Sequence, residues 1–202
     1  STNATLTSSS DNFTFSSTVD SDGSTRNLTL NAGSGTIGIS NAIGGGAALG
    51  TLTITQSGGT TFSGTVNAGI VTLTDTTGSV TFAGSTTLTT LNTAAENYNV
   101  IFTGASNTFT EQVTFSNTGY VKFGDASGDS STFNGSLITA EPSQIRLAGT
   151  LQTSNDAMTV GTAVVLYTNS ILNTGNAALL LNGTINGAYT LTLNSTAATT
   201  FA

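Results

Sequence analysis

The side chains that most often carry out catalysis are scarce in this chain. It contains no His and no Cys, so a Ser-His-Asp triad, a Cys-His pair and histidine- or cysteine-based metal sites are all excluded. Carboxylates remain, and two of them a few ångströms apart can cleave a glycosidic bond. The acids that could form such a pair are Asp75, Glu96, Glu111, Asp125 and Asp129. They are dispersed and mostly turn-like in context, so a polysaccharide-processing enzyme is the alternative hypothesis and a non-catalytic protein is the favoured one.

Two short acidic clusters could supply oxygen ligands to Ca²⁺. One is Asp20-Ser21-Asp22-Gly23, and the other runs from Gly124 to Asp129. Neither has the remaining acidic positions of an EF-hand loop or the glycine-rich repeat of calcium-binding β-rolls. We therefore favour solvated turn aspartates over calcium ligands, and we predict no catalytic, cofactor-binding or metal-binding residue.

Acceptor patterns for N-glycosylation, Asn-x-Ser/Thr, occur at Asn3, Asn12, Asn27, Asn134, Asn182 and Asn194. A chain this rich in Asn, Ser and Thr produces such matches by chance. Glycosylation is therefore left open.

Threonines alternate with apolar residues in segments such as Thr51–Thr55 and Thr72–Thr74. Flat arrays of outward threonines occur in ice-binding solenoids, which makes ice binding a second alternative. These pairs do not recur at one fixed spacing, however. We favour β-branched residues that suit an exposed strand face.

Charge and hydropathy limit the possible partners. Three basic residues stand against ten acidic ones, giving a net charge of −7, so we expect neither nucleic acid nor an anionic membrane as partner. The longest apolar runs, Ala163–Tyr167 and Ala177–Leu181, are about five residues long against the roughly twenty needed to span a bilayer. A chain without Cys also suits a protein that folds after export. We expect an extracellular location.

A repeat organises the chain and would have to position any site. Phe62, Phe82 and Phe102 lie twenty residues apart, each followed two residues later by Gly, with Phe123 continuing the series and Phe15 and Ile39 preceding it. Between these marks, Leu, Ile or Val alternates with Thr, which predicts strands. These strands are expected around Leu28–Leu30, Leu52–Ile54, Val71–Leu73 and Leu191–Leu193. Turns are expected at Gly44–Gly46, Gly58-Gly59, Asn117–Gly119 and Asn134-Gly135.

Repetition on the scale of a whole coil favours a solenoid over the rival antiparallel sandwich. We predict an all-β fold, a right-handed parallel β-helix with coils of about twenty residues, in which residues 1–202 form a single β-solenoid segment. About ten coils at a spacing of about 4.8 Å would make a rod about 50 Å long. Phe62, Phe82 and Phe102 are expected to stack as an inward ladder.

Other parts of the sequence are interpreted through the same repeat. Phe13, Phe15, Phe115 and Phe123 are expected in the core with the ladder rather than in a binding groove. Leu147-Ala148-Gly149 and Leu181-Asn182-Gly183 resemble aliphatic copies of the Phe-x-Gly unit. Thr199–Ala202 matches the start of a further copy, which indicates a fragment or subunit of a longer surface protein.

Residues 50–74, GTLTITQSGGTTFSGTVNAGIVTLT, resemble the passenger-associated repeat of bacterial autotransporters, and the chain as a whole looks like filamentous-haemagglutinin-type adhesins. The resemblance implies a right-handed β-helical passenger at the bacterial cell surface, and no catalytic residue carries over with it. The favoured function is therefore an extracellular structural or adhesive β-solenoid, displayed on a surface or forming filaments. Its expected partners are copies of itself, neighbouring coils of a longer chain, or a host or matrix glycan or protein.

Overall fold

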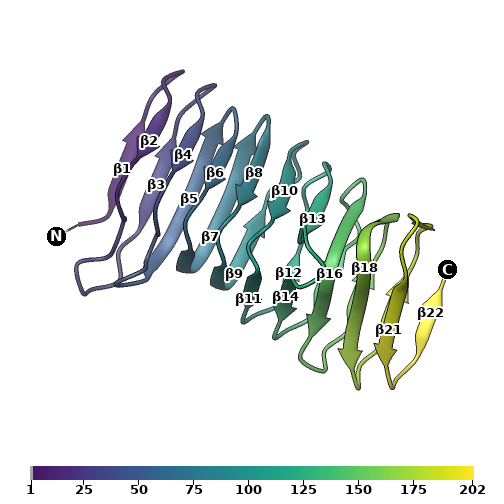
Figure 1. The fold of residues 1–202 in the computed structure, drawn as a ribbon. Coiled ribbons are helices and arrows are strands. Elements are labelled where there is room, and N and C mark those ends of the chain that lie inside the picture. The colour runs from purple at the N-terminus through teal and green to yellow at the C-terminus, as the bar shows by residue number, and fades with distance from the viewer. Residues whose placement is uncertain (1) are drawn as a thin grey trace.

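The computed structural model describes residues 2–202 as a β-solenoid of about 9 turns, with stacked coils about 21 residues apart (Figure 1). This part of the chain contains no helix, and 54% of it is strand. The strands are β1 (Ala4–Thr7), β2 (Phe13–Phe15), β3 (Leu28–Asn31), β4 (Ile37–Ile39), β5 (Leu49–Ser57), β6 (Thr60–Phe62), β7 (Val66–Thr76), β8 (Ser79–Phe82), β9 (Thr86–Thr93), β10 (Asn99–Phe102), β11 (Ser106–Phe109), β12 (Val113–Thr114), β13 (Val121–Phe123), β14 (Ser130–Phe133), β15 (Leu137–Thr139), β16 (Ile145–Thr153), β17 (Met158–Val160), β18 (Val164–Gly175), β19 (Leu179–Leu181), β20 (Ile185–Asn186), β21 (Leu191–Ser195) and β22 (Thr199–Phe201).

Each coil runs over face A, then face B, then face C of the solenoid. Face A consists of β1, β3, the second parts of β5, β7 and β9, and then β12, β15, β17, β19 and β22. Face B consists of β2, β4, β6, β8, β10, β13, the first parts of β16 and β18, and β20. Face C contains the first parts of β5, β7 and β9, then β11, β14, the second parts of β16 and β18, and β21.

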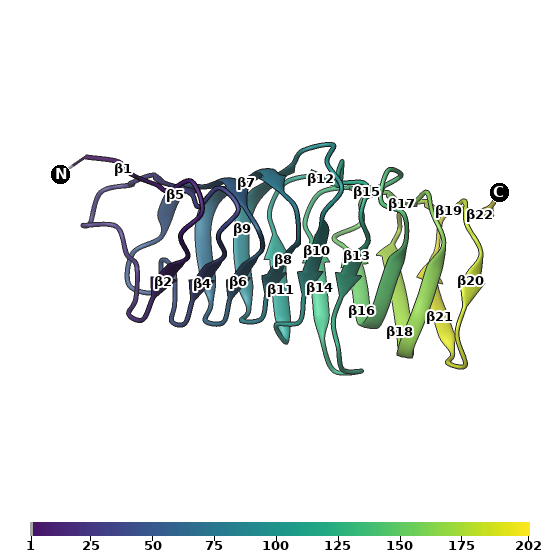
Figure 2. The ribbon, with the colours of Figure 1, turned by 90° about the horizontal axis from the view of Figure 1, so that it is seen from above.

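All the paired strands run parallel, which excludes the antiparallel sandwich and confirms the predicted solenoid. With about 9 turns rather than ten, the spacing of about 4.8 Å gives a rod about 43 Å long. Viewed from above, the coils follow one another from the N-terminal to the C-terminal end without a break (Figure 2). The right-handed sense of the coil stays a prediction from crossover chirality.

The predicted phenylalanine ladder is confirmed on face B. Neighbouring ring centroids lie 4.8 Å apart for Phe62 and Phe82, and 4.9 Å apart for Phe82 and Phe102, and both pairs are stacked. Phe123 continues the stack beyond Phe102 at 5.9 Å. Phe15 and Ile39 precede it in register, as their sequence spacing predicted. The three central rings have no exposed surface, so they are core.

A second aromatic stack, which was not predicted from the sequence, lies inside face C. Phe109 and Phe133 stack with their centroids 4.5 Å apart, because β11 and β14 pair in register. Phe102 contacts Phe109 edge-on at 5.4 Å, and Phe115 on face A contacts Phe123 edge-on at 5.7 Å. Aromatic contacts of this kind add to the burial of the rings, so they join the faces in the middle of the rod.

The glycine of the Phe-x-Gly unit marks a corner where consecutive coils approach closely. A Cβ added to Gly84 would lie 2.2 Å from the carbonyl oxygen of Gly64, and one added to Gly104 would lie 2.3 Å from that of Gly84. No side chain fits in that space, so glycine recurs at this corner in the three successive coils of Gly64, Gly84 and Gly104.

Two sequence assignments place a residue on the wrong face. Leu181 and Phe201 pair with each other and, through β17, with Val160 on face A. They do not continue the face B ladder of Phe62, whereas Leu147 does, by pairing with Phe123. Because apolar residues precede turns at every corner, the short motif marks a corner of the solenoid and does not identify which one.

Candidate functional site

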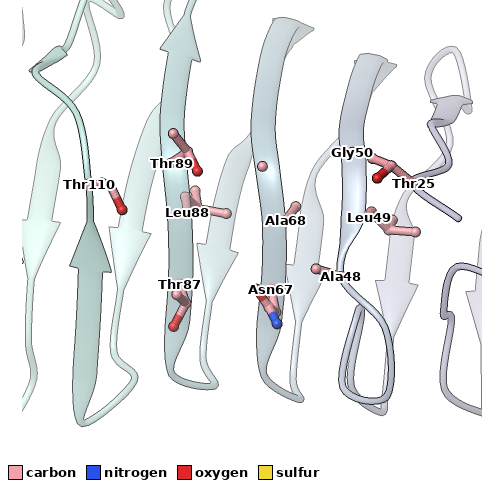
Figure 3. Close-up of a pocket in the computed structure, with 11 residues that line it drawn as sticks. Thr25, Ala48, Leu49, Gly50, Asn67, Ala68, Thr87, Leu88, Thr89 and Thr110 are labelled. Carbon is pink, nitrogen blue, oxygen red and sulfur yellow. The ribbon is translucent and has the colours of Figure 1, made fainter. Parts of the chain in front are cut away.

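A groove of about 310 Å³ runs across successive coils where face C meets face A (Figure 3). Its lining comes from the turn before β3, from β5 and the residue before it, from β7 and β9, and from the residue after β11. These residues are Thr25, Ala48, Leu49, Gly50, Asn67, Ala68, Gly69, Thr87, Leu88, Thr89 and Thr110.

Small residues create the hollow. Leu49 pairs in register with Ala68, and Gly50 and Gly69 follow them at the bend of β5 and β7. A Cβ on Gly69 would lie 2.8 Å from the carbonyl oxygen of Gly50, so the two coils lie too close for a larger residue there. This groove was not predicted from the sequence, although glycine inside an alternating strand pattern is a signal of close backbone approach.

The chemistry of the groove is neutral. Hydroxyl and amide groups of Asn67, Thr87, Thr89 and Thr110 line it (Figure 3), and its lining includes no carboxylate and no cation. Such groups donate and accept hydrogen bonds but do not serve as general acid or base near neutral pH. The groove could hold a neutral polar ligand, and its lining provides no residue for acid–base catalysis.

Of the acids considered for glycoside cleavage, only Asp125 and Asp129 share a loop. Asp75 is near the end of β7, where its carboxylate accepts a hydrogen bond of 3.0 Å from the Gln56 amide. Glu96 lies in the turn before β10, and Glu111 in the turn before β12. Asp125 and Asp129 lie in the loop between β13 and β14. None of them lines the groove.

The acidic cluster between β13 and β14 has a structural role. The buried Asp129 carboxylate accepts hydrogen bonds from the backbone N–H groups of Asp125, at 2.8 Å, and Ala126, at 2.9 Å. These two hydrogen bonds stabilise the loop between β13 and β14.

The acidic cluster from Asp20 to Gly23 also has a structural role. Asp20 accepts a hydrogen bond of 2.9 Å from the Gly46 N–H, which joins adjacent coils. Asp22 binds Arg26 through both carboxylate oxygens, at 2.7 and 3.0 Å, and this bond raises the pKa of the Arg26 guanidinium. Within residues 2–202, no group of three or more acidic side chains is arranged to hold a metal ion.

Several asparagines of the glycosylation patterns bridge coils. The side-chain oxygen of Asn3 accepts a hydrogen bond from the N–H of Asn27, and that of Asn27 accepts one from Thr51, at 3.1 and 2.9 Å. Asn12 accepts from the Thr36 N–H at 2.8 Å, and Asn134 from the Ser154 hydroxyl at 2.7 Å. Asn182 and Asn194 are exposed. Stacking thus accounts for part of the abundance of Asn, and glycosylation stays open.

The outward threonines align better than their spacing indicated. Thr5, Thr29, Thr53 and Thr72 pair in register on face A, because turns of unequal length absorb the uneven spacing. The row then ends at Asn92. The neighbouring outward row is mixed, with Asn31 opposite Gln56 and Gln56 opposite Asp75. Uneven spacing therefore does not rule out an array, yet on face A the aligned threonines form only a single row.

Tyr98 is a buried ionisable group that the sequence analysis did not single out. Its side chain is 1% exposed, and its hydroxyl donates to the Leu73 carbonyl at 3.3 Å. Burial disfavours the phenolate and raises the pKa of Tyr98 to about 12. Tyr98 therefore closes the core at the corner between faces A and B as a neutral phenol.

Comparison with protein-family models, with curated proteins and with solved structures gives no match. The solenoid is consistent with β-helical repeat proteins, and the likeness to autotransporter passengers stays a prediction from residues 50–74. No helix in residues 2–202 has the length and apolar character required to cross a lipid bilayer.

Proposed function

We propose that this solenoid is a structural and adhesive rod displayed outside the cell, without catalytic turnover. The observation that carries the proposal is the uninterrupted core, in which large apolar side chains point inward through about 9 turns. Such a structure holds its two ends at a fixed separation and presents long strand faces to its surroundings. Neutral Thr, Ser and Asn side chains dominate those faces and suit contact with polar surfaces.

The two edges of the stack support association with further coils. β1 pairs only with β3, and β22 only with β19, in the described part of the chain. Apolar side chains are uncovered there: Leu6 is 37% exposed and Phe201 is 63% exposed. Unpaired parallel strands with apolar inner faces are templates for strand addition. A second copy of the solenoid could pair with these strands, which would give the self-association included in the proposal.

Labelling of intact cells tests the location. Antibodies raised against the chain are expected to label unpermeabilised cells of the source organism, and deletion of the gene is expected to reduce attachment to surfaces. Labelling only after permeabilisation would overturn the proposal. Small-angle scattering over a concentration series separately tests association, which Leu6→Lys and Phe201→Lys are expected to reduce because a charge at the edge opposes pairing.

A further inference from the structure

Two of the three basic residues of this acidic protein lie side by side on the outside of face B. Lys122 on β13 pairs directly with Arg146 on β16. Like charges directly opposite each other on neighbouring strands destabilise a sheet, so packing alone does not favour this arrangement. Arg26, the remaining cation, is neutralised by Asp22.

No carboxylate neutralises the pair. In residues 2–202, the one salt bridge is that between Arg26 and Asp22. The outward neighbours of the pair along face B are Ile101 on β10 and Val165 on β18. Two positive charges are therefore concentrated between apolar neighbours on a molecule of net charge −7.

Tyrosine rings and an amide hold both cations at the surface. The Arg146 guanidinium carbon lies 3.6 Å from the centre of the Tyr120 ring, and the Lys122 ammonium lies 5.9 Å from that of Tyr167. Arg146 also donates from Nε to the Gln144 side-chain oxygen at 3.0 Å. Its ring contact and this bond fix the guanidinium plane, and its terminal nitrogens donate to no acceptor in the described chain. A fixed guanidinium fork fits the paired oxygens of a carboxylate or sulfate.

We propose that Lys122, Arg146 and Tyr167 form a binding site for an acidic saccharide. The anionic group, a carboxylate or a sulfate, binds to the terminal nitrogens of the Arg146 fork, and the Lys122 ammonium beside Tyr167 adds positive charge on the same face. The Tyr167 ring, 45% exposed, packs against the sugar ring. Two cations in an acidic chain suit an isolated anionic group better than the dense charge of a nucleic acid. The site deepens the adhesive part of the proposed function and relies on it for a biological role, whereas binding itself is measured on the purified protein.

Biolayer interferometry at low salt tests the site, with polygalacturonate as the carboxylate probe, dextran sulfate as the sulfate probe and dextran as the neutral one. The purified chain is expected to bind one or both acidic probes and not dextran. Arg146→Gln and Lys122→Gln are each expected to weaken binding at least about 10-fold, and Arg146→Lys to weaken it because the fork is lost while the charge stays. Arg26→Gln is the matched control: it removes the same charge elsewhere and is expected to leave binding within about twofold.

The acidic peptide polyglutamate separates a saccharide site from a general site for anions. Tyr167→Ala is expected to weaken saccharide binding and to leave any weak polyglutamate binding unchanged. No binding by the purified chain, an equal loss with Arg26→Gln, or polyglutamate binding as tight as that of the saccharides would each overturn the site. Thermal melting checks the fold, and Lys122→Gln is expected not to lower Tm because it relieves a like-charge contact. Absence of cell-surface labelling would overturn the proposed function and leave this binding result unchanged.

Discussion

Replacement of Phe82 by Ala removes the middle ring of the face B stack. Phe82 has no exposed surface and lies 4.8 and 4.9 Å from the rings of Phe62 and Phe102. A buried Phe removes roughly 150–250 Å² from water, and Phe→Ala changes in cores typically cost about 3–5 kcal/mol. Two stacked contacts, worth about 0.5–1.5 kcal/mol each beyond burial, place the expected loss in the upper part of that range. We expect about 4–5 kcal/mol less free energy of unfolding.

Guanidinium denaturation followed by circular dichroism measures this loss. Hydrogen exchange then locates it, because each coil of a solenoid contacts only its neighbours. Protection is expected to fall in β6, β8 and β10 and to persist in β17 and β19. Phe82→Leu retains most of the apolar burial but loses both ring contacts, so we expect an intermediate cost of about 1–3 kcal/mol.

Thr81→Ala is the matched control, because Thr81 is the preceding residue and points outward from the same strand. Its expected effect is within about 0.5 kcal/mol. A loss for Phe82→Ala below about 1 kcal/mol, or no larger than that of Thr81→Ala, would refute the conclusion that the ladder carries the core.

Three further perturbations test the turns and the buried phenol. Gly124 has a φ of +76°, and a Cβ there would lie 2.2 Å from the Ala148 carbonyl oxygen, so Gly124→Ala is expected to lower the free energy of unfolding by more than about 1 kcal/mol. Gly128 lies in the same loop with open space around it, so Gly128→Ala is expected to be neutral or slightly stabilising in chemical denaturation. Asp129→Ala leaves two backbone N–H groups without their acceptor and is expected to lower the free energy of unfolding by about 1–3 kcal/mol. Asp125 is exposed, so Asp125→Ala is expected to cost about 0.5 kcal/mol or less, and equal losses for the two variants would contradict the role of Asp129 in the turn. The pKa of Tyr98 is near its ordinary value of 10.0 in the unfolded chain and about 12 in the folded chain, so the stability that Tyr98 contributes is complete below pH 10 and falls as pH rises from about 10 to about 12. Over that pH range, the free energy of unfolding of Tyr98→Phe is expected to decline less than that of the parent protein. Identical declines would disprove the assignment.

The sequence was most informative where local periodicity and stacking act together. The ladder from Phe15 to Phe123 could be predicted, because one large residue recurred at coil spacing and had to pack against its own copy. The face on which Leu181 and Phe201 lie could not be predicted, because apolar and polar residues alternate in the same way on every face. Only the number of residues in each turn assigns a strand to a face. Turn length carries almost no sequence signal.

The features of the candidate sites were harder to predict than the core. The groove depends on small residues, Gly50 and Gly69, being neighbours across coils although they are nineteen residues apart in sequence. Lys122 and Arg146 are separated by twenty-four positions, a longer interval than the twenty-residue ladder predicted. Their direct pairing becomes visible only once the longer loop between β13 and β14 is known. Sites formed across coils thus depend on register, which local patterns do not determine.

The turns differ in length although the strands that they connect stack in regular columns, and this determines how the rod tolerates insertions and deletions. In register, Leu28 to Leu52 spans 24 residues and Leu52 to Val71 spans 19, yet all three side chains stack in one column. The corners therefore accommodate insertions and deletions while the hydrogen-bonded rows stay aligned. A peptide tag or epitope inserted at Gly128, where nothing crowds the backbone, would be carried outside the rod without shifting the coils on either side. The corners are in effect permissive insertion points on a fixed scaffold, and they allow the displayed loops to diversify independently of the core.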